Sequence, residues 1–301
     1  MKKTSITSNL ITDGQKKQYK RFVEDATNRG VELALEKVSL DKTGFQRLLE
    51  NGDEFNSTIA EVIVSKTREL SVSNQFADEE VKSSYGYLSG YKPKGITEQT
   101  NILRQLFPGI GFADEKLVSQ PVPEGAEGWF AIPKWQSTAP TYGEAVQKVL
   151  DLIKKTRDGK FYNYREGQLG PKNLRQSEKS AKMFQKLGEE QRDHDILVVP
   201  AQFGILHRGR SVRRAREVMN ANQFGLGAFA IGIMLLTHPE RLQNYDDLWI
   251  DCAGDEFSPE ADGDFSRAPC FGFRGGEVEF GADWVGSAVG RCSSASGFVS
   301  Q

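Results

Sequence analysis

Arginine is concentrated at residues 207–216 of the 301-residue chain, where five arginines and one histidine occur. A loop is expected to end here and a helix to begin, with Ser211 as its N-cap. A helix N-terminus offers free backbone N–H groups and the positive end of the helix dipole, and arginine adds paired donors that match an oxyanion. The run therefore predicts a non-catalytic site for a phosphate-bearing partner such as RNA or DNA. Its ligands would be Arg208, Arg210, Arg213, Arg214 and Arg216.

The sequence before this run is basic and carries aromatic residues. Residues 154–216 contain 16 Lys and Arg against 7 Asp and Glu, and Tyr162 and Tyr164 lie in the same stretch. Basic residues interleaved with aromatic ones can follow a nucleic-acid backbone and stack on its bases. A solvated or salt-bridged helix end fits the same residues, and no RRM, KH or zinc-finger signature accompanies them.

The sequence that follows has the opposite charge. Residues 240–283 contain 12 Asp and Glu against 3 Lys and Arg, so the net charge of −2 for the whole chain hides two strongly charged stretches. The basic stretch of one copy could pair with the acidic stretch of another. A structural or self-assembling protein, and hence a homo-oligomer, is a second hypothesis.

Carboxylates at the end of a predicted apolar strand support a third hypothesis, a hydrolase. Asp251, Asp255 and Glu256 follow the strand that begins at Leu248. Acid–base or metal-assisted hydrolysis needs such groups to converge with a histidine, and the candidates are His207 and His238. Whether the chain is an enzyme stays open, because the spacing of these residues does not require a common site.

Metal and cofactor motifs are incomplete. Glu260, Asp262 and Asp264 are spaced like the first ligands of a calcium loop, but Phe265 stands where an EF-hand needs glycine, and no distal glutamate follows. The three cysteines form no C-x-x-C pair, so they indicate reduced thiols rather than a zinc site or a disulfide framework. No metal and no cofactor is predicted.

Helical periodicity dominates the first part of the chain. Apolar residues recur at helical spacing over 13–35, 43–50 and 54–70, which predicts a helical domain at residues 1–82. A Gly-, Ser-, Tyr- and Pro-rich stretch then begins a linker and connecting segment at 83–140.

Residues 141–301 predict an α+β domain with a mixed or antiparallel sheet. Thr141 and Glu144 form a capping box for a helix that reaches residue 156, and Pro171 suits the start of another helix. Residues 237–240 are predicted to form a second capping box.

The strands of this domain are indicated by two patterns. Residues 195–200 are apolar on both sides, as in a central strand, and from residue 248 the apolar pattern has a period of two with a hairpin turn at 274–276. One sheet is expected to contain both 196–199 and 248–280.

Nothing in the sequence predicts export or membrane insertion. Two lysines follow Met1, but the apolar segment of a signal peptide does not come after them. The longest apolar run, residues 225–236, has 12 residues, whereas a membrane-spanning helix needs about 20. This run is expected to be a buried helix, and the chain a cytoplasmic protein without a membrane partner.

Three segments resemble a group of bacterial proteins that have no assigned activity. They are residues 10–26 (LITDGQKKQYKRFVEDA), residues 247–256 (DLWIDCAGDE) and residues 294–298 (SASGF). The resemblance implies a bacterial, intracellular origin and carries over no catalytic residue.

Overall fold

The computed structural model describes residues 11–71 and 73–299. They form an α+β protein that divides into two compact units, Met1–Ser73 and Asn74–Gln301. Residues 1–10, whose two lysines resemble the start of a signal peptide, lie outside the described residues. Residues 74–82 belong to the second unit, as does the expected connecting segment at 83–140.

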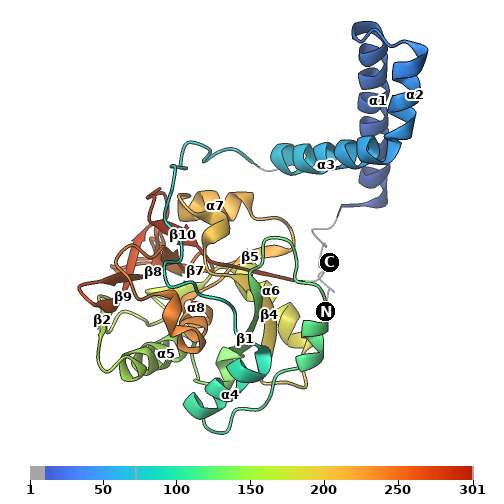
Figure 1. Cartoon of the computed structure of the whole chain (residues 1–301). Helices are drawn as coiled ribbons and strands as arrows, with labels where there is room; N and C mark the ends of the chain where they lie inside the picture. The colour runs from blue at the N-terminus through green and yellow to red at the C-terminus, as the bar shows by residue number, and fades with distance from the viewer. Residues whose placement is uncertain (1–10, 72, 300–301) are drawn as a thin grey trace, which may run out of the picture. The chain divides into compact units, whose positions relative to one another are not determined.

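The described part of the first unit consists of three helices, as the periodicity predicted (Figure 1). The hydroxyl groups of Tyr19 and Thr67 hydrogen-bond to each other. Neither of the first two helices has a buried residue, and Phe22 is 66% exposed. Apolar side chains of these helices therefore lie on the surface of the unit. The helices are α1 (Asp13–Lys37), α2 (Lys42–Glu50) and α3 (Gly52–Ser71).

One sheet of the second unit has four antiparallel strands in the described residues, in the order β1–β4–β11–β5. β4 is buried at every residue, which confirms the predicted central strand. β11 comes from the Gly- and Ser-rich end of the chain. It lies between β4 and β5, which are distant from it in sequence. The strands are β1 (Gly128–Pro133), β4 (Ile196–Gln202), β5 (Gln223–Gly225) and β11 (Ser296–Phe298).

The other sheet has seven strands in the described residues and is mixed. Its order is β10–β6–β8–β7–β3, with β9 paired to β8 and β2 paired to β9. The predicted hairpin turn is confirmed, because Arg274 on β8 pairs with Glu277 on β9. The strands are β2 (Phe161–Asn163), β3 (Leu174–Gln176), β6 (Trp249–Asp251), β7 (Asp255–Phe257), β8 (Arg267–Arg274), β9 (Glu277–Trp284) and β10 (Cys292–Ser294).

The expectation of one sheet containing 196–199 and 248–280 is therefore wrong. β4 pairs with β1 and β11, whereas the strands between 249 and 284 pair among themselves and with β2, β3 and β10. Apolar periodicity identifies a strand but not its neighbour, since pairing depends on contacts that are distant in sequence.

Five α-helices of the described residues belong to the second unit, and their starts test the capping predictions. The Thr141–Glu144 capping box is confirmed. The helix start expected at Pro171 is wrong, because β3 intervenes and Ser177 caps the helix instead. The second capping box is also wrong, because the Thr237 hydroxyl donates to the carbonyls of Ile233 and Met234 in its own helix. The helices are α4 (Ile96–Leu106), α5 (Tyr142–Thr156), α6 (Glu178–Glu190), α7 (Val212–Val218) and α8 (Ala228–Thr237); 3-10 helices are η1 (Glu115–Ser119), η2 (Trp135–Ser137), η3 (Ile205–His207) and η4 (Pro239–Arg241).

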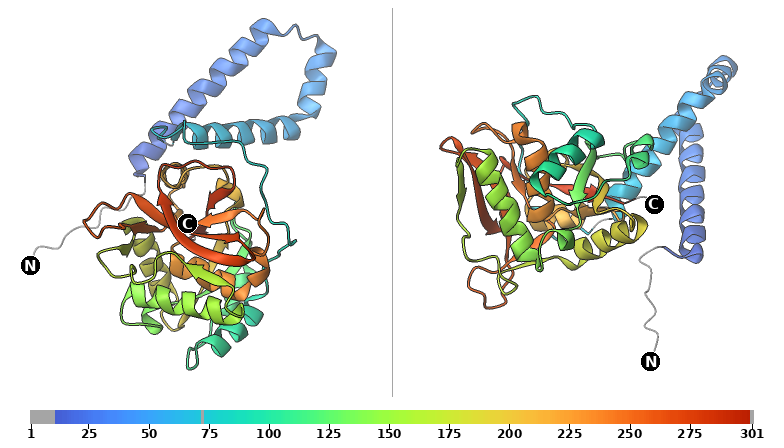
Figure 2. Two further views of the ribbon diagram at one scale, coloured as in Figure 1. Left: turned by 90° about the vertical axis from the view of Figure 1, so that its left-hand side faces the viewer. Right: turned by 90° about the horizontal axis from the view of Figure 1, so that it is seen from below.

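Helix α8 lies at the centre of the second unit. It is buried at every residue and packs against α5 and β1 (Figures 1 and 2). Gly232 permits the close approach, because a Cβ there would lie 2.4 Å from Val149 Cγ1 on α5. The expectation of a buried helix in the apolar run is thus confirmed for residues 228–236, while its first residue belongs to β5. Across the described residues, every helix is too short or too polar to cross a bilayer.

Candidate functional site

The arginine run (residues 208–216) lies against residues 74–82 of the same unit. Arg213 donates through Nε and Nη2 to the Glu79 carboxylate, and Ser211 donates its hydroxyl to the same group at 2.7 Å. Ser211 is also the N-cap of α7, as predicted. The hydrogen bond from Arg213 holds the pKa of Glu79 below its ordinary value. Much of the positive charge expected at this helix start is therefore neutralised within the chain.

Two further arginines of the run share one glutamate. Arg214 Nε lies 2.5 Å from Glu80 Oε1, and its Nη1 lies 2.8 Å from Glu217 Oε2. Arg210 Nε lies 3.3 Å from Glu80 Oε2. The side chain of Arg214 is only 10% exposed, so these ion pairs fix α7 to the 74–82 segment.

The remaining arginines contact backbone carbonyls. Arg216 donates to the carbonyls of Ala253 and Asp255 at 2.8 and 2.6 Å. Arg208 is exposed and donates to the carbonyl of Tyr85 at 3.4 Å. Tyr162 and Tyr164, the expected stacking residues, lie on and after β2 with ring centroids 4.6 Å apart, and both are about half exposed.

Removing one glutamate of this network is expected to loosen residues 74–82. Glu79→Ala should lower the free energy of unfolding by about 1–3 kcal/mol, because it leaves Arg213 and the Ser211 hydroxyl without their acceptor. Hydrogen–deuterium exchange of residues 79–83 should increase. The exposed neighbour Asp78 makes no hydrogen bond or ion pair in the described residues, so Asp78→Ala is the matched control. Equal exchange in the two variants would contradict the structural role of Glu79.

The residues of the hydrolase hypothesis have separate surroundings. Asp255 accepts from the Tyr142 hydroxyl at 2.7 Å and from the Ala228 amide at 2.7 Å. Glu256 pairs with Arg175 at 2.7 Å. His207 is buried beside Gln223, with 2.8 Å between the two side-chain nitrogens, and burial lowers its pKa to about 3. In the described residues no hydrogen bond joins any two of Asp251, Asp255, Glu256 and His207.

Asp251 is the most unusual of these carboxylates. It is 7% exposed, and in the described residues its carboxylate accepts no hydrogen bond. In the strand register it lies opposite Cys270. Burial and the nearby charge of Asp283 raise its pKa to about 7. A carboxyl group with a raised pKa favours the protonated state in the folded protein, so it destabilises the fold when ionised.

Asp251 is therefore expected to make the protein less stable as pH rises. Its pKa increases from 3.8 to about 7 on folding. The protonated carboxyl group therefore contributes its full stability below pH 4, and this contribution is lost as pH rises through 7. The neutral variant Asp251→Asn should gain stability relative to the natural protein over this range, by at most about 4 kcal/mol. Urea unfolding at pH 4 to 8 measures the difference. A difference that does not change with pH would contradict the assignment.

The acidic residues considered for calcium lie in the loop between β7 and β8. Asp262 accepts from the Ser258 hydroxyl and from the Asp264 amide, both at 3.0 Å. Asp264 in turn accepts from the Ser266 hydroxyl. Glu260, the first residue of the set, is exposed. Within the described ranges no group of three or more His, Cys, Asp or Glu side chains is arranged to hold a metal ion.

A cavity of about 410 Å³ lies on one face of the seven-stranded sheet. Across β8 and β9, Cys270 pairs with Gly281 and Gly272 with Glu279, so these residues share that face. Phe271 and its neighbours on the opposite face are in the core. We call this cavity the sheet pocket. The side chains that matter for its chemistry are Tyr164, Arg165, Trp249, Arg274, Glu279, Asp283 and Arg291.

Three arginines line the sheet pocket. Arg274 Nε lies 4.0 Å from Glu279 Oε2. Arg165 donates to the Ala282 carbonyl at 3.3 Å, and Arg291 rests on Trp249 with its Cζ 4.4 Å from the ring centroid. Neither Arg165 nor Arg291 forms an ion pair with a carboxylate in the part of the chain that the structure describes. Their charge is therefore available to a ligand.

Two donors of the pocket lining are buried without an acceptor in the described residues. They are Arg165 Nε and Trp249 Nε1. An unsatisfied buried donor costs about 1–3 kcal/mol, and most such groups in folded proteins find a partner. The carboxylates present do not supply one: Glu279 accepts from Tyr164 Oη at 3.3 Å, and Asp283 is exposed. Both atoms are themselves shielded from solvent.

The sequence hypotheses named only one of these lining residues, Tyr164. The three arginines were missed because they belong to three separate segments of the chain, each with one arginine. A signal was present in the period-two pattern, which puts Gly272 and Gly281 on the face opposite the phenylalanines. Comparisons of this chain with protein-family models, curated proteins and solved structures found no match. The functional assignment therefore rests on the geometry of the pocket.

Proposed function

We propose that this protein binds a small phosphate-bearing ligand in the sheet pocket. The observation that carries the proposal is the convergence of three arginines on one cavity, two of them without a carboxylate partner in the described residues. Guanidinium groups bind phosphate through paired N–H donors, and such charge-assisted bonds are about twice as strong as neutral ones.

Trp249 supports this role by ordering the arginines. Its ring lies over Gly272, where a Cβ would approach the ring atoms to 2.6 Å. The Cζ atoms of Arg274 and Arg291 lie 5.3 and 4.4 Å from its ring centroid. Side chains that are already held by stacking lose less conformational freedom when a ligand binds.

The size of the cavity favours a small ligand. A volume of about 410 Å³ lies in the range of small-molecule sites, about 300–1,000 Å³. The arginine run supports a phosphate ligand less well, because Glu79, Glu80 and Glu217 neutralise three of its side chains. The proposal therefore keeps the phosphate-bearing ligand predicted from the sequence. It assigns this ligand to the sheet pocket instead of the arginine run.

Isothermal titration calorimetry with the full chain tests the proposal. Pyrophosphate is expected to bind at about 50 mM salt and to bind more weakly as salt increases, because the contacts are ionic. Acetate, a carboxylate of similar charge per oxygen, should bind more weakly, and a short single-stranded RNA should bind no more tightly than pyrophosphate. Absence of pyrophosphate binding at about 1 mM ligand, or a clear preference for RNA or acetate, would overturn the proposal.

A further inference from the structure

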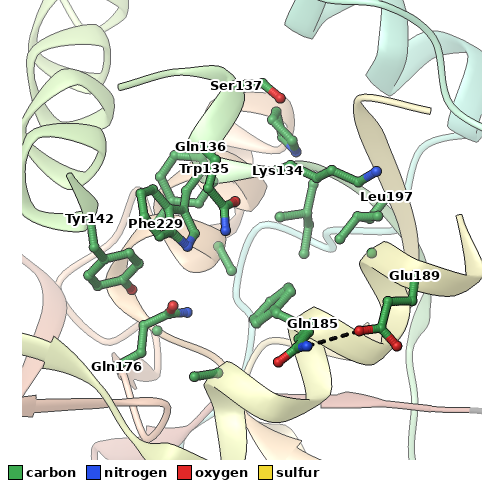
Figure 3. Close-up of a pocket in the computed structure, with 17 residues that line it drawn as sticks. Lys134, Trp135, Gln136, Ser137, Tyr142, Gln176, Gln185, Glu189, Leu197 and Phe229 are labelled. Carbon is green, nitrogen blue, oxygen red and sulfur yellow. Dashed lines mark hydrogen bonds between the residues drawn. The ribbon is translucent and has the colours of Figure 1, made fainter. Parts of the chain in front are cut away.

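A second cavity, of about 490 Å³, lies among η2, α5, α6 and the start of α8 (Figure 3). It shares no lining residue with the sheet pocket. Aromatic side chains form much of its wall, and we call it the aromatic pocket. Trp135 and Tyr142 meet edge to face with their ring centroids 5.9 Å apart, while Phe229 is buried. These walls favour a planar, apolar body.

Two amide side chains supply polar groups to this pocket. Gln136 and Gln176 point toward the cavity from two sides (Figure 3). In the described residues neither amide makes a side-chain hydrogen bond, whereas Gln185 at the rim donates to Glu189 at 2.9 Å. An amide offers both two N–H donors and a carbonyl acceptor. The pocket therefore matches a ligand that carries donors and acceptors on one edge.

The charged groups at the pocket already have partners. Lys134 Nζ donates to the carbonyls of Gln191 and Arg192 at 3.1 and 3.4 Å. Glu189 accepts the hydrogen bond from Gln185. The lining carries one cation and one carboxylate, so its formal charges sum to zero and an uncharged ligand is favoured here.

Tyr142 adds an acceptor at the inner end. Its hydroxyl proton is committed to Asp255, at 2.7 and 2.9 Å from the two carboxylate oxygens. The Phe229 amide also hydrogen-bonds to this hydroxyl, so its oxygen keeps one lone pair for a ligand donor. Gly227 leaves room for this arrangement, since a Cβ there would lie 2.5 Å from the Tyr142 hydroxyl oxygen.

From these contacts we infer that the aromatic pocket binds an uncharged planar heterocycle with both donors and acceptors on its edge. A purine or pyrimidine base and a nicotinamide ring have this chemistry. The aromatic walls hold the ring faces, and Gln136, Gln176 and Tyr142 bond its edge. The inference is independent of the phosphate site, because the two cavities have different linings.

Saturation-transfer NMR and calorimetry with adenine, uracil and nicotinamide test the inference. At least one of them is expected to bind the full chain. Gln176→Leu keeps the side-chain size but removes the amide, and it should weaken binding about fivefold to tenfold, as expected for one hydrogen bond. Ala181→Phe should abolish binding by filling the cavity. Gln243→Leu, an exposed glutamine outside the pocket, should leave affinity unchanged.

Three results would overturn the inference. One is the absence of binding by all three compounds at about 1 mM. Another is unchanged affinity in both Gln176→Leu and Ala181→Phe when the variants keep the thermal unfolding temperature of the natural protein. The third is equal affinity for toluene, which has the ring but lacks the polar edge.

Discussion

Asp255→Ala is expected to lower the free energy of unfolding of the second unit by about 3–5 kcal/mol. Asp255 is fully buried and accepts from the Tyr142 hydroxyl and from the first amide of α8, on Ala228. Its removal leaves both donors buried without an acceptor, at about 1–3 kcal/mol each. The same change removes the side-chain acceptor at the start of a helix that forms the centre of the unit.

Urea unfolding followed by tryptophan fluorescence measures this effect. All four tryptophans lie in the second unit, so their signal reports on that unit. A pH of about 5.5 is suitable, because burial raises the pKa of Asp255 to about 7 and the carboxyl group is then mainly neutral. Glu256→Ala, which removes a partly exposed ion pair with Arg175, is the control and should cost less than about 1 kcal/mol. Equal losses in the two variants would contradict the structural role of Asp255.

Arg274→Ala combined with Arg291→Ala is expected to weaken pyrophosphate binding at least about 100-fold. Hydrogen bonds to charged groups contribute about 1.5–3 kcal/mol each, and about 1.4 kcal/mol is a factor of ten in affinity. The fold should tolerate the change, because Arg274 is exposed and Arg291 makes no hydrogen bond through its guanidinium group in the described residues. The loss of stacking on Trp249 costs about 0.5–1 kcal/mol per cation–π contact.

Arg208→Ala provides a matched control for this pair. Arg208 is an exposed arginine of the arginine run, with a single 3.4 Å hydrogen bond to a carbonyl. Its replacement should leave pyrophosphate affinity unchanged. If the affinity falls in Arg208→Ala and persists in the double variant, the ligand binds at the arginine run and the assignment to the sheet pocket is wrong.

Local features of the fold could be predicted from the sequence, and pairing over long distances could not. The three N-terminal helices, the Thr141 capping box and the turn at 274–276 depend on residues within one or two turns of each other. The division of the strands into two sheets depends on which apolar strands meet. The error at Pro171 has a local cause and a long-range one. Ser177 caps the helix instead, and Leu174 pairs with Phe257 of β7, which is distant in sequence.

The candidate sites show the same limit. The arginine run could be recognised from the local amino-acid composition. Its partners Glu79 and Glu80 could not, because they lie more than a hundred residues earlier in the chain. The arginines of the sheet pocket carry no local signature, since each stands alone in its segment. Asp251 and Asp255 were found because they stand at the end of one predicted strand, yet the fold gives them different neighbours.

Anomalous diffraction from crystals soaked in selenate tests the location of the phosphate site most directly. Selenate has the tetrahedral shape of phosphate, and its selenium atom can be located without interpretation of side-chain density. The account predicts a selenate within hydrogen-bonding distance of at least two of Arg165, Arg274 and Arg291, in the cavity beside Trp249. Selenate bound only along the arginine run, with the sheet pocket empty, would contradict it.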